Sequence, residues 1–313
     1  MYVSRIRVSG MKCFGGPREV DLAIPDGPGW TVLAGPNGSG KSTLLRAVGM
    51  ALGAVEAGPE ERWLADGYRE AWVEAEPAPR WRIGDPPARA RARYVGRGDG
   101  PQVRLAAELL DGEVLPNGWR VTDPERQYVA RGGLEVPLDE LGDGIAALAR
   151  LVSAVAADHR PGPVLLDDVD RQLHPAWQQR IGPWLTEHFP QAQFVVATHS
   201  PYVCQAADPG ALVHLPDPAE DRAPYRLDEE LHQRVLYGSG DDTALSELFG
   251  LPSAYSPAAE AERRLLVRLE RKMYAGQATD AEVAAYRELG AKLNSSLTAR
   301  VDEVTARLLG RDR

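Results

Sequence analysis

Apolar positions along the chain change their spacing from one segment to the next. Residues 1–24 predict two short strands, and the alternation of polar and apolar residues over 19–24 is typical of a half-exposed antiparallel strand. The compact apolar run 30–34 predicts a buried strand, and a helix with one apolar face is expected over about 41–52. The residues expected to face inward are Val20, Leu22, Ile24, Leu44, Leu45 and Val48.

The middle of the chain, from about residue 54 to residue 131, lacks such a pattern. Proline, glycine and arginine are frequent there and helical periodicity is weak, so an inserted lobe of short strands and loops is predicted. The basic strip of this lobe could bind phosphate or an acidic partner protein, although clustered arginines more often form a solvated charged face. The strip contains Arg80, Arg82, Arg89, Arg91, Arg93, Arg97 and Arg104.

Regular periodicity returns in the second half of the chain. A helix with a continuous apolar stripe is predicted over about 144–157. Unbroken apolar runs follow at 164–166 and 194–197, and such runs are typical of buried parallel strands. A helix that starts near Pro175 separates them, so the order strand–helix–strand predicts a parallel sheet with right-handed crossovers.

The end of the chain predicts a pair of amphipathic helices. Ser256 and Pro257 supply a cap and a first-turn proline for one helix, and Thr279 with Glu282 forms a capping box for the next. Beyond this box apolar residues recur every three or four positions as far as Leu308. We therefore expect a helical hairpin that offers a surface to a second copy or to a partner protein.

Composition narrows the class of protein. The hydrophobic fraction of 43% is ordinary for a globular chain, and no apolar run approaches the roughly 18 residues of a membrane span. The N-terminus lacks a signal-peptide core, and Cys13 and Cys204 stand far apart, so a cytoplasmic protein without a cysteine-based metal site is expected. The net charge of −9 argues against a general nucleic-acid coat, because counterion release needs a positive surface.

Residues Gly35–Ser42 read GPNGSGKS and match the phosphate-binding loop (P-loop) GxxxxGK[ST]. The motif follows an apolar strand and opens a helix, so its backbone N–H groups and the helix N-terminus can meet phosphate oxygens. Lys41 is expected to neutralise the β- and γ-phosphates of a nucleoside triphosphate, and the Ser42 hydroxyl to bind Mg²⁺. The expected nucleotide-binding residues are Asn37, Gly38, Ser39, Gly40, Lys41, Ser42 and Thr43.

Polar residues end two of the predicted parallel strands. One strand is followed by Asp167, placed to hold Mg²⁺, and by Asp168, placed to polarise the attacking water. The next is followed by His199, on the ligand side of such sheets, where it can donate a hydrogen bond to the γ-phosphate. Lys41, Asp168 and His199 are therefore the expected catalytic residues.

A resemblance to the stand-alone RecF/SMC-like ABC-type ATP-binding proteins is carried by two stretches, GPNGSGKST and LLDDVDRQLHPAWQQRIGPWLTEHFPQAQFVVATHSP. That group includes the overcoming-lysogenisation-defect ATPases and the ATPases paired with effectors in Septu and some retron anti-phage systems. The resemblance covers 1–53 and 134–215, and more weakly the tail. It implies that Leu173–Pro175 lies at a dimer seam, that His199 is a switch histidine and that Lys12 lies beside the nucleotide.

Two positions depart from that family's pattern. The family signature, which caps the nucleotide of the partner subunit, resembles LSGGQ or LSDGYR, whereas the matching stretch here starts at Leu141 and has Gly142 in place of the serine. Most relatives carry glutamate where this chain has the shorter Asp168. Both changes predict that ATP is bound but hydrolysed slowly. The glutamine that links metal to the inserted lobe in the family is either Gln102 or Gln127.

The predicted fold class is α/β: an ABC-type P-loop NTPase head with a mixed sheet, a small inserted lobe and a C-terminal helical hairpin. The head is expected to comprise 1–53 and 134–215, with the lobe over 54–133 and a helical dimerisation or partner-binding region over 216–313.

The predicted function is a weak ATP hydrolase that uses ATP and Mg²⁺. It is expected to form a homodimer around ATP and to regulate an effector protein, such as a nuclease, in anti-phage defence. One alternative is a RecF-like DNA-repair ATPase that clamps DNA, and another is a nucleotide-sensing scaffold that does not hydrolyse ATP. No membrane partner is expected, because the LSGGQ of a transporter's energising subunit is absent.

Overall fold

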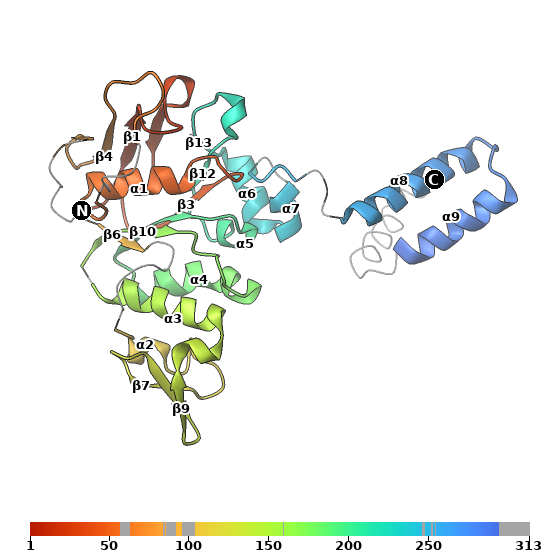
Figure 1. Cartoon of the computed structure of the whole chain (residues 1–313). Coiled ribbons are helices and arrows are strands. Elements are labelled where there is room, and N and C mark those ends of the chain that lie inside the picture. The colour runs from red at the N-terminus through yellow and green to blue at the C-terminus, as the bar shows by residue number, and fades with distance from the viewer. Residues whose placement is uncertain are drawn as a thin grey trace. The chain divides into compact units, whose positions relative to one another are not determined.

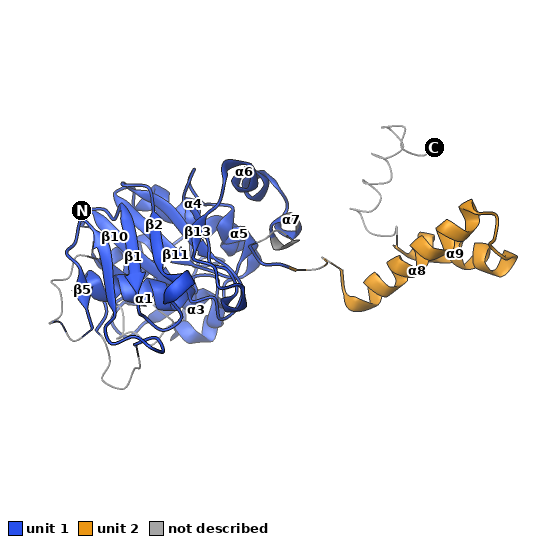
Figure 2. Cartoon of the chain, turned by 90° about the horizontal axis from the view of Figure 1, so that it is seen from above, with its two compact units in different colours: residues 1–250 blue, residues 251–313 orange. Residues whose placement is uncertain are grey.

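The computed structural model divides the chain into two compact units, residues 1–250 and 251–313, which Figure 2 shows in different colours. The described residues are 1–56, 63–83, 85, 92–95, 104–158, 160–245, 248–251, 253 and 255–293.

A six-stranded sheet in the order β13-β12-β3-β11-β10-β6 forms the centre of the first unit. Its strands from β12 to β6 pair in parallel, and β13 is an antiparallel edge strand. The predicted parallel pairing of the two apolar runs is therefore confirmed, and the sheet is mixed as expected. The strands are β3 (Gly29–Ala34), β6 (Arg93–Val95), β10 (Gly162–Asp167), β11 (Ala192–Ala197), β12 (Leu212–His214) and β13 (Tyr225–Arg226).

Helices cover both faces of this sheet, with α1 on one face and α3 and α4 on the other (Figure 1). Successive residues of each strand enter different cores, because side chains alternate across a strand. Leu33 and Leu165 join the core beneath α1, whereas Val32 and Leu166 join the core beneath α3 and α4. Burial on both faces explains why these strands read as unbroken apolar runs. These helices and the short α5 span Lys41–Ala51 (α1), Asp143–Ala156 (α3), Pro175–His188 (α4) and Pro201–Cys204 (α5).

The N-terminal strands belong to a second, antiparallel sheet in the order β2-β1-β4-β5. Val20 and Leu22 alternate with exposed residues in β2, as the sequence predicted, and share a core with Leu44 and Leu45 of α1. The four strands are β1 (Arg5–Ser9), β2 (Val20–Ala23), β4 (Trp72–Glu76) and β5 (Trp81–Arg82).

Residues 54–133, predicted to form one inserted lobe, contribute to three sheets. Strands β4 and β5 complete the N-terminal sheet, β6 is an edge of the central sheet, and β7, β8 and β9 form a separate antiparallel sheet. The short strands of this segment cannot bury their apolar faces alone, so β4 pairs with β1 and β6 pairs with β10, while β5 pairs with β4. The last part spans α2 (Ala107–Leu110), β7 (Arg120–Asp123) and β8 (Tyr128–Arg131), and β8 pairs with β9 (Leu134–Pro137), which follows the predicted lobe.

The first unit ends with α6 (Glu229–Tyr237) and α7 (Gly240–Leu245). The second unit is a hairpin of α8 (Pro257–Tyr274) and α9 (Asp280–Leu293), which confirms the two predicted helices, and their predicted continuation to Leu308 lies outside the described residues. The hydroxyl of Ser256 caps α8, and the predicted capping box at Thr279 is present. Among the described residues, no helix is long and apolar enough to cross a membrane.

Candidate functional site

The carboxyl ends of β3, β11 and β10 lie side by side at one edge of the central sheet. Asp167 at the end of β10 is opposite Ala197 of β11, which in turn is opposite Leu33 of β3. The residues that follow these three strands are the P-loop, the histidine segment and the second aspartate. The sheet therefore brings together the three motifs that the sequence analysis singled out.

The P-loop connects β3 to α1 through glycines in unusual backbone conformations. Gly38 and Gly40 have φ values of +81° and +102°, in the left-handed region that favours glycine. A Cβ on Gly40 would lie 2.6 Å from Cys13 Sγ and from the Phe14 ring, whereas a Cβ on Gly38 would meet nothing within 4 Å. Cys13 and Phe14 thus form a wall behind the loop. Of the other predicted binding residues, Asn37 is exposed, Ser39 is buried and Thr43 is half-buried.

Lys41, the first residue of α1, is buried with its ammonium group inside the loop. Its Nζ donates hydrogen bonds to the carbonyl oxygens of Gly35 and Pro36, each at 2.8 Å. Burial lowers the pKa of Lys41 to about 8, although nearby carboxylates, first of all that of Asp168, favour the charged form. A phosphate chain at this point would add negative charge and hold the lysine protonated.

Ser42 and Asp167 are in direct contact, although 125 positions separate them in the sequence. The Ser42 hydroxyl donates a 2.8 Å hydrogen bond to Asp167 Oδ1, and the Tyr94 hydroxyl of β6 donates one of 2.9 Å to Oδ2. One carboxylate and one hydroxyl fit Mg²⁺, which keeps several water or phosphate ligands. The described residues contain no group of three or more His, Cys, Asp or Glu side chains that could hold a metal ion. Tyr94 was not among the predicted site residues, because it lies in the arginine-rich segment without periodicity.

The loop after β10 is tied to the loop after β11. Asp168 has φ +53°, a left-handed conformation that is uncommon for a residue other than glycine, so the chain turns sharply there. The carboxylate of Asp170 then accepts hydrogen bonds from the Thr198 hydroxyl and, at 3.3 Å, from the backbone N–H of His199. The predicted switch histidine is half-buried, and Asp170 fixes its backbone beside the paired aspartates.

A glutamine of α4, which the sequence analysis did not identify, holds the same two loops. Gln178 Nε2 donates to the carbonyl oxygens of Asp170, at 3.3 Å, and of Leu173, at 2.9 Å. Its Oε1 accepts a 2.6 Å hydrogen bond from the Ser200 hydroxyl. No motif marks this glutamine, and its only signal in the sequence is its place one turn after the start of the helix.

The signature-like stretch and the predicted seam segment are neighbours in space. A Cβ on Gly144 would lie 2.7 Å from the carbonyl oxygen of Gln172, so the start of α3 packs closely on the loop that leads to Leu173–Pro175. Gly142 has φ +98° and ψ +147°, a conformation that only glycine adopts without strain. Within the seam segment His174 caps α4 with its imidazole Nδ1, which gives this exposed histidine a structural role.

The remaining predicted residues lie around this centre or outside the described part. Lys12 Nζ lies 4.1 Å from the centroid of the Trp63 ring, next to the Cys13–Phe14 wall. Gln127 Oε1 accepts a 2.9 Å hydrogen bond from Arg150 of α3. Gln102, the other candidate for the metal-linking glutamine, lies outside the described residues.

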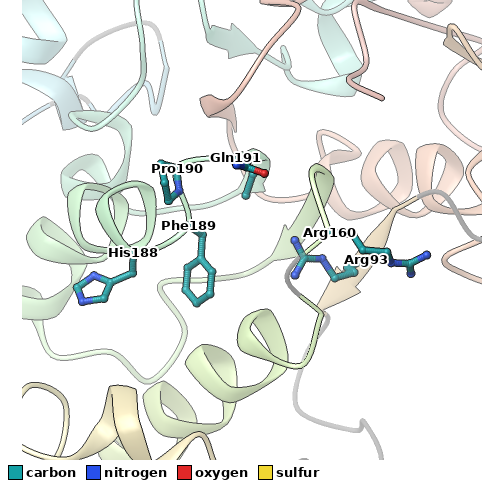
Figure 3. Close-up of a pocket in the computed structure, with 7 residues that line it drawn as sticks. Arg93, Arg160, His188, Phe189, Pro190 and Gln191 are labelled. Carbon is teal, nitrogen blue, oxygen red and sulfur yellow. The ribbon is translucent and has the colours of Figure 1, made fainter.

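A pocket of about 240 Å³ lies where β6 and β11 begin, at the amino ends of the parallel strands and so at the opposite end of these strands from the P-loop (Figure 3). Its two arginines are already engaged. Arg93 donates a 2.6 Å hydrogen bond to the carbonyl oxygen of Val155, and Arg160 pairs with Asp158 at 2.7 Å and holds the pKa of that carboxyl at about 2. This pocket is therefore a weaker candidate for phosphate binding than the P-loop.

Two further arginines of the predicted basic strip also have local partners. Arg80 lies over the Trp72 ring, 3.8 Å from its centroid, and Arg104 pairs with Glu125 at 3.0 Å. Arg89, Arg91 and Arg97 lie outside the described residues.

Comparisons with known families and proteins agree with this geometry. Residues 5–68 match the family model described as "AAA domain", and residues 97–205 match "AAA domain, putative AbiEii toxin, Type IV TA system". The chain is 53% identical to the Retron Ec83 probable ATPase of Escherichia coli over 47 residues, which are 15% of this chain and 9% of that protein. It is 32% identical to the Septu protein PtuA of Bacillus thuringiensis over 96 residues, which are 31% of this chain and 24% of that protein.

The chain thus spans only a small share of the curated relatives that it matches. Among solved structures, a crystal structure of an Smc head bound to the C-terminal winged-helix domain of ScpA aligns with a TM-score of 0.50 and 15% identity. The alignment covers 75% of this chain and 100% of that chain, and at this identity it shows the fold alone. The predicted fold of an ABC-type P-loop head is confirmed, and so is the resemblance of the sequence to a retron ATPase and a Septu protein.

Proposed function

We propose that this chain, which carries an ABC-type P-loop ATPase head, binds ATP together with Mg²⁺ and hydrolyses the ATP slowly. The observation that carries this proposal is the 2.8 Å hydrogen bond between Ser42 and Asp167, which joins the P-loop to the end of β10. The two oxygen atoms suited to Mg²⁺ thereby lie beside Lys41 and the helix N-terminus, where a phosphate chain would bind.

Each side chain has a proposed task. The backbone N–H groups of residues 37–43 bind the phosphates, Lys41 neutralises them, and Ser42 and Asp167 would hold Mg²⁺. The metal supplies charge that stabilises the transferred phosphoryl group. Asp168 accepts a proton from the attacking water, while His199 donates a hydrogen bond to the γ-phosphate. Lys12, held beside the loop, contacts the nucleotide.

Two copies are proposed to close head to tail around two ATP molecules. In support, the signature-like stretch at Gly142 and the seam segment Leu173–Pro175 are adjacent, so one face presents both. Because the relatives include a retron ATPase and a Septu protein, we propose that the nucleotide state of the dimer regulates an effector protein, such as a nuclease, in anti-phage defence. The DNA-clamping alternative has less support, since Arg80 and Arg104 are paired with acidic residues.

Slow turnover is assigned to the short Asp168. Its carboxylate is one methylene nearer the backbone than a glutamate, and misplacement of a catalytic group by about 1 Å costs on the order of a hundredfold in rate. We expect Asp168→Glu to raise the steady-state rate of phosphate release, while Asp280→Glu, which adds the same methylene to an exposed residue of α9, leaves it unchanged. A lower or unchanged rate for Asp168→Glu would show that the site is tuned to aspartate, and the slow-hydrolysis proposal would then fail.

A further inference from the structure

Arg18 places a buried guanidinium group directly behind the P-loop. It is the last residue of a short 3-10 helix, Gly16–Arg18, and only 4% of it is exposed. Its side chain donates four hydrogen bonds, all to backbone carbonyl oxygens. The acceptors are Cys13 at 3.3 Å, Ser39 at 3.2 Å, Pro216 at 3.1 Å and Asp217 at 2.9 Å.

This guanidinium joins three segments that are distant in sequence: the turn after β1, the P-loop and the loop after β12. The ion pairs of the described residues do not include Arg18, so carbonyl dipoles balance its charge. A buried cation is costly unless hydrogen bonds satisfy it. The arrangement therefore needs a planar fork with several donors, which arginine has and lysine lacks.

The bond to Ser39 has a directional consequence for the loop. A peptide unit is planar and trans, so its C=O and the following N–H point in opposite directions. When Arg18 holds the Ser39 oxygen from behind, the N–H of Gly40 is aimed at the front of the loop. The same guanidinium also holds the carbonyl of Cys13, whose side chain presses against Gly40.

We propose that Arg18 is a positioning residue for phosphate binding: it fixes the Ser39–Gly40 peptide so that the Gly40 N–H meets a phosphate oxygen of the nucleotide. Arg18 itself does not touch the nucleotide. The proposal rests on the proposed function of the P-loop, and it differs from a purely structural role, in which Arg18 would only secure the loop after β12.

The test compares the dissociation constant for ATP·Mg²⁺ with thermal stability in four variants. Arg18→Met removes the donors and keeps the length of the side chain, and Arg18→Lys keeps the charge on a single nitrogen. Arg5→Met removes a half-exposed arginine of β1 that pairs with Asp21. Val8→Ala opens a cavity in the same N-terminal core, which lowers stability without contact to Ser39.

Measured below the melting temperature of every folded variant, Arg18→Met and Arg18→Lys are expected to weaken ATP binding by roughly 10- to 100-fold. Val8→Ala and Arg5→Met are expected to bind like the wild type. If Arg18→Met is folded and binds ATP like the wild type, the inference is wrong. Where Arg18→Met does not fold, wild-type affinity in Arg18→Lys has the same meaning. Failure of the wild type itself to bind ATP would instead overturn the proposed function.

Discussion

Replacing Gly40 with alanine should damage the P-loop more than the same change at Gly38. Both glycines have a left-handed backbone, which costs an alanine about 1–2 kcal/mol. Only at Gly40 would the new Cβ overlap neighbours, Cys13 Sγ and the Phe14 ring, at 2.6 Å. Phe14 is fully buried, so relief of this overlap requires movement in the core and costs about a further 1–3 kcal/mol.

The expected loss is therefore about 2–5 kcal/mol for Gly40→Ala, against about 1–2 kcal/mol for Gly38→Ala. If the substituted loop keeps its shape, the protein loses stability. If the loop rearranges to relieve the overlap, the protein loses affinity for ATP instead. The relevant quantity is thus the sum of the change in the free energy of unfolding, from denaturant titration, and the change in binding free energy, from calorimetry.

If both variants give the same sum, Cys13 and Phe14 do not form a wall behind Gly40, and the described loop geometry is wrong. A further control truncates one wall residue. Cys13→Ala in the Gly40→Ala background removes the sulfur that the new Cβ would meet, so it should recover part of the loss. In the wild-type background the same truncation removes a contact without relieving any overlap.

Three further changes test the neighbouring contacts. Lys41→Ala should abolish ATP binding in a calorimetric titration, because the loop loses its full positive charge at the phosphates. Tyr94→Phe removes a donor to Asp167, so the Mg²⁺ concentration that half-saturates ATP binding should rise about tenfold, and an unchanged value would exclude this role. Asp170→Asn should lower turnover about tenfold while ATP affinity stays unchanged, since it weakens the anchor of His199, and equal losses in both would contradict this division.

The central part of the fold could be predicted from the sequence because its signals are local. The strands β3, β10 and β11 are buried on both faces, so they read as short unbroken apolar runs. The P-loop could also be predicted from the sequence, since Gly38 and Gly40 adopt backbone conformations that no other residue type adopts as easily.

The contacts that complete the site could not be predicted, because they join distant segments. Tyr94 and Asp167 are 73 positions apart, and Arg18 and the carbonyl of Asp217 are 199 apart. Neither Tyr94 nor Arg18 belongs to a motif, and each becomes significant only when the strands pair. The division of residues 54–133 among three sheets was missed for the same reason.

One departure from the family pattern has a local physical explanation. Slow hydrolysis was predicted partly from Gly142, where relatives have serine. In the structure Gly142 has φ +98° and ψ +147° at the start of α3, so a serine there would be strained. Substitution of Gly142 by serine would therefore test backbone strain together with the missing hydroxyl, and Asp168→Glu is the cleaner experiment.

The proposed dimer has two copies that close around ATP through the face that carries the P-loop. Light scattering of the full chain with and without ATP·Mg²⁺ tests it most directly, with Lys41→Ala as the control that should not respond to nucleotide. We expect ATP·Mg²⁺ to double the mass of the wild-type species and to leave that of Lys41→Ala unchanged. A mass that is the same with and without ATP, in a wild-type protein shown to bind ATP, would contradict it.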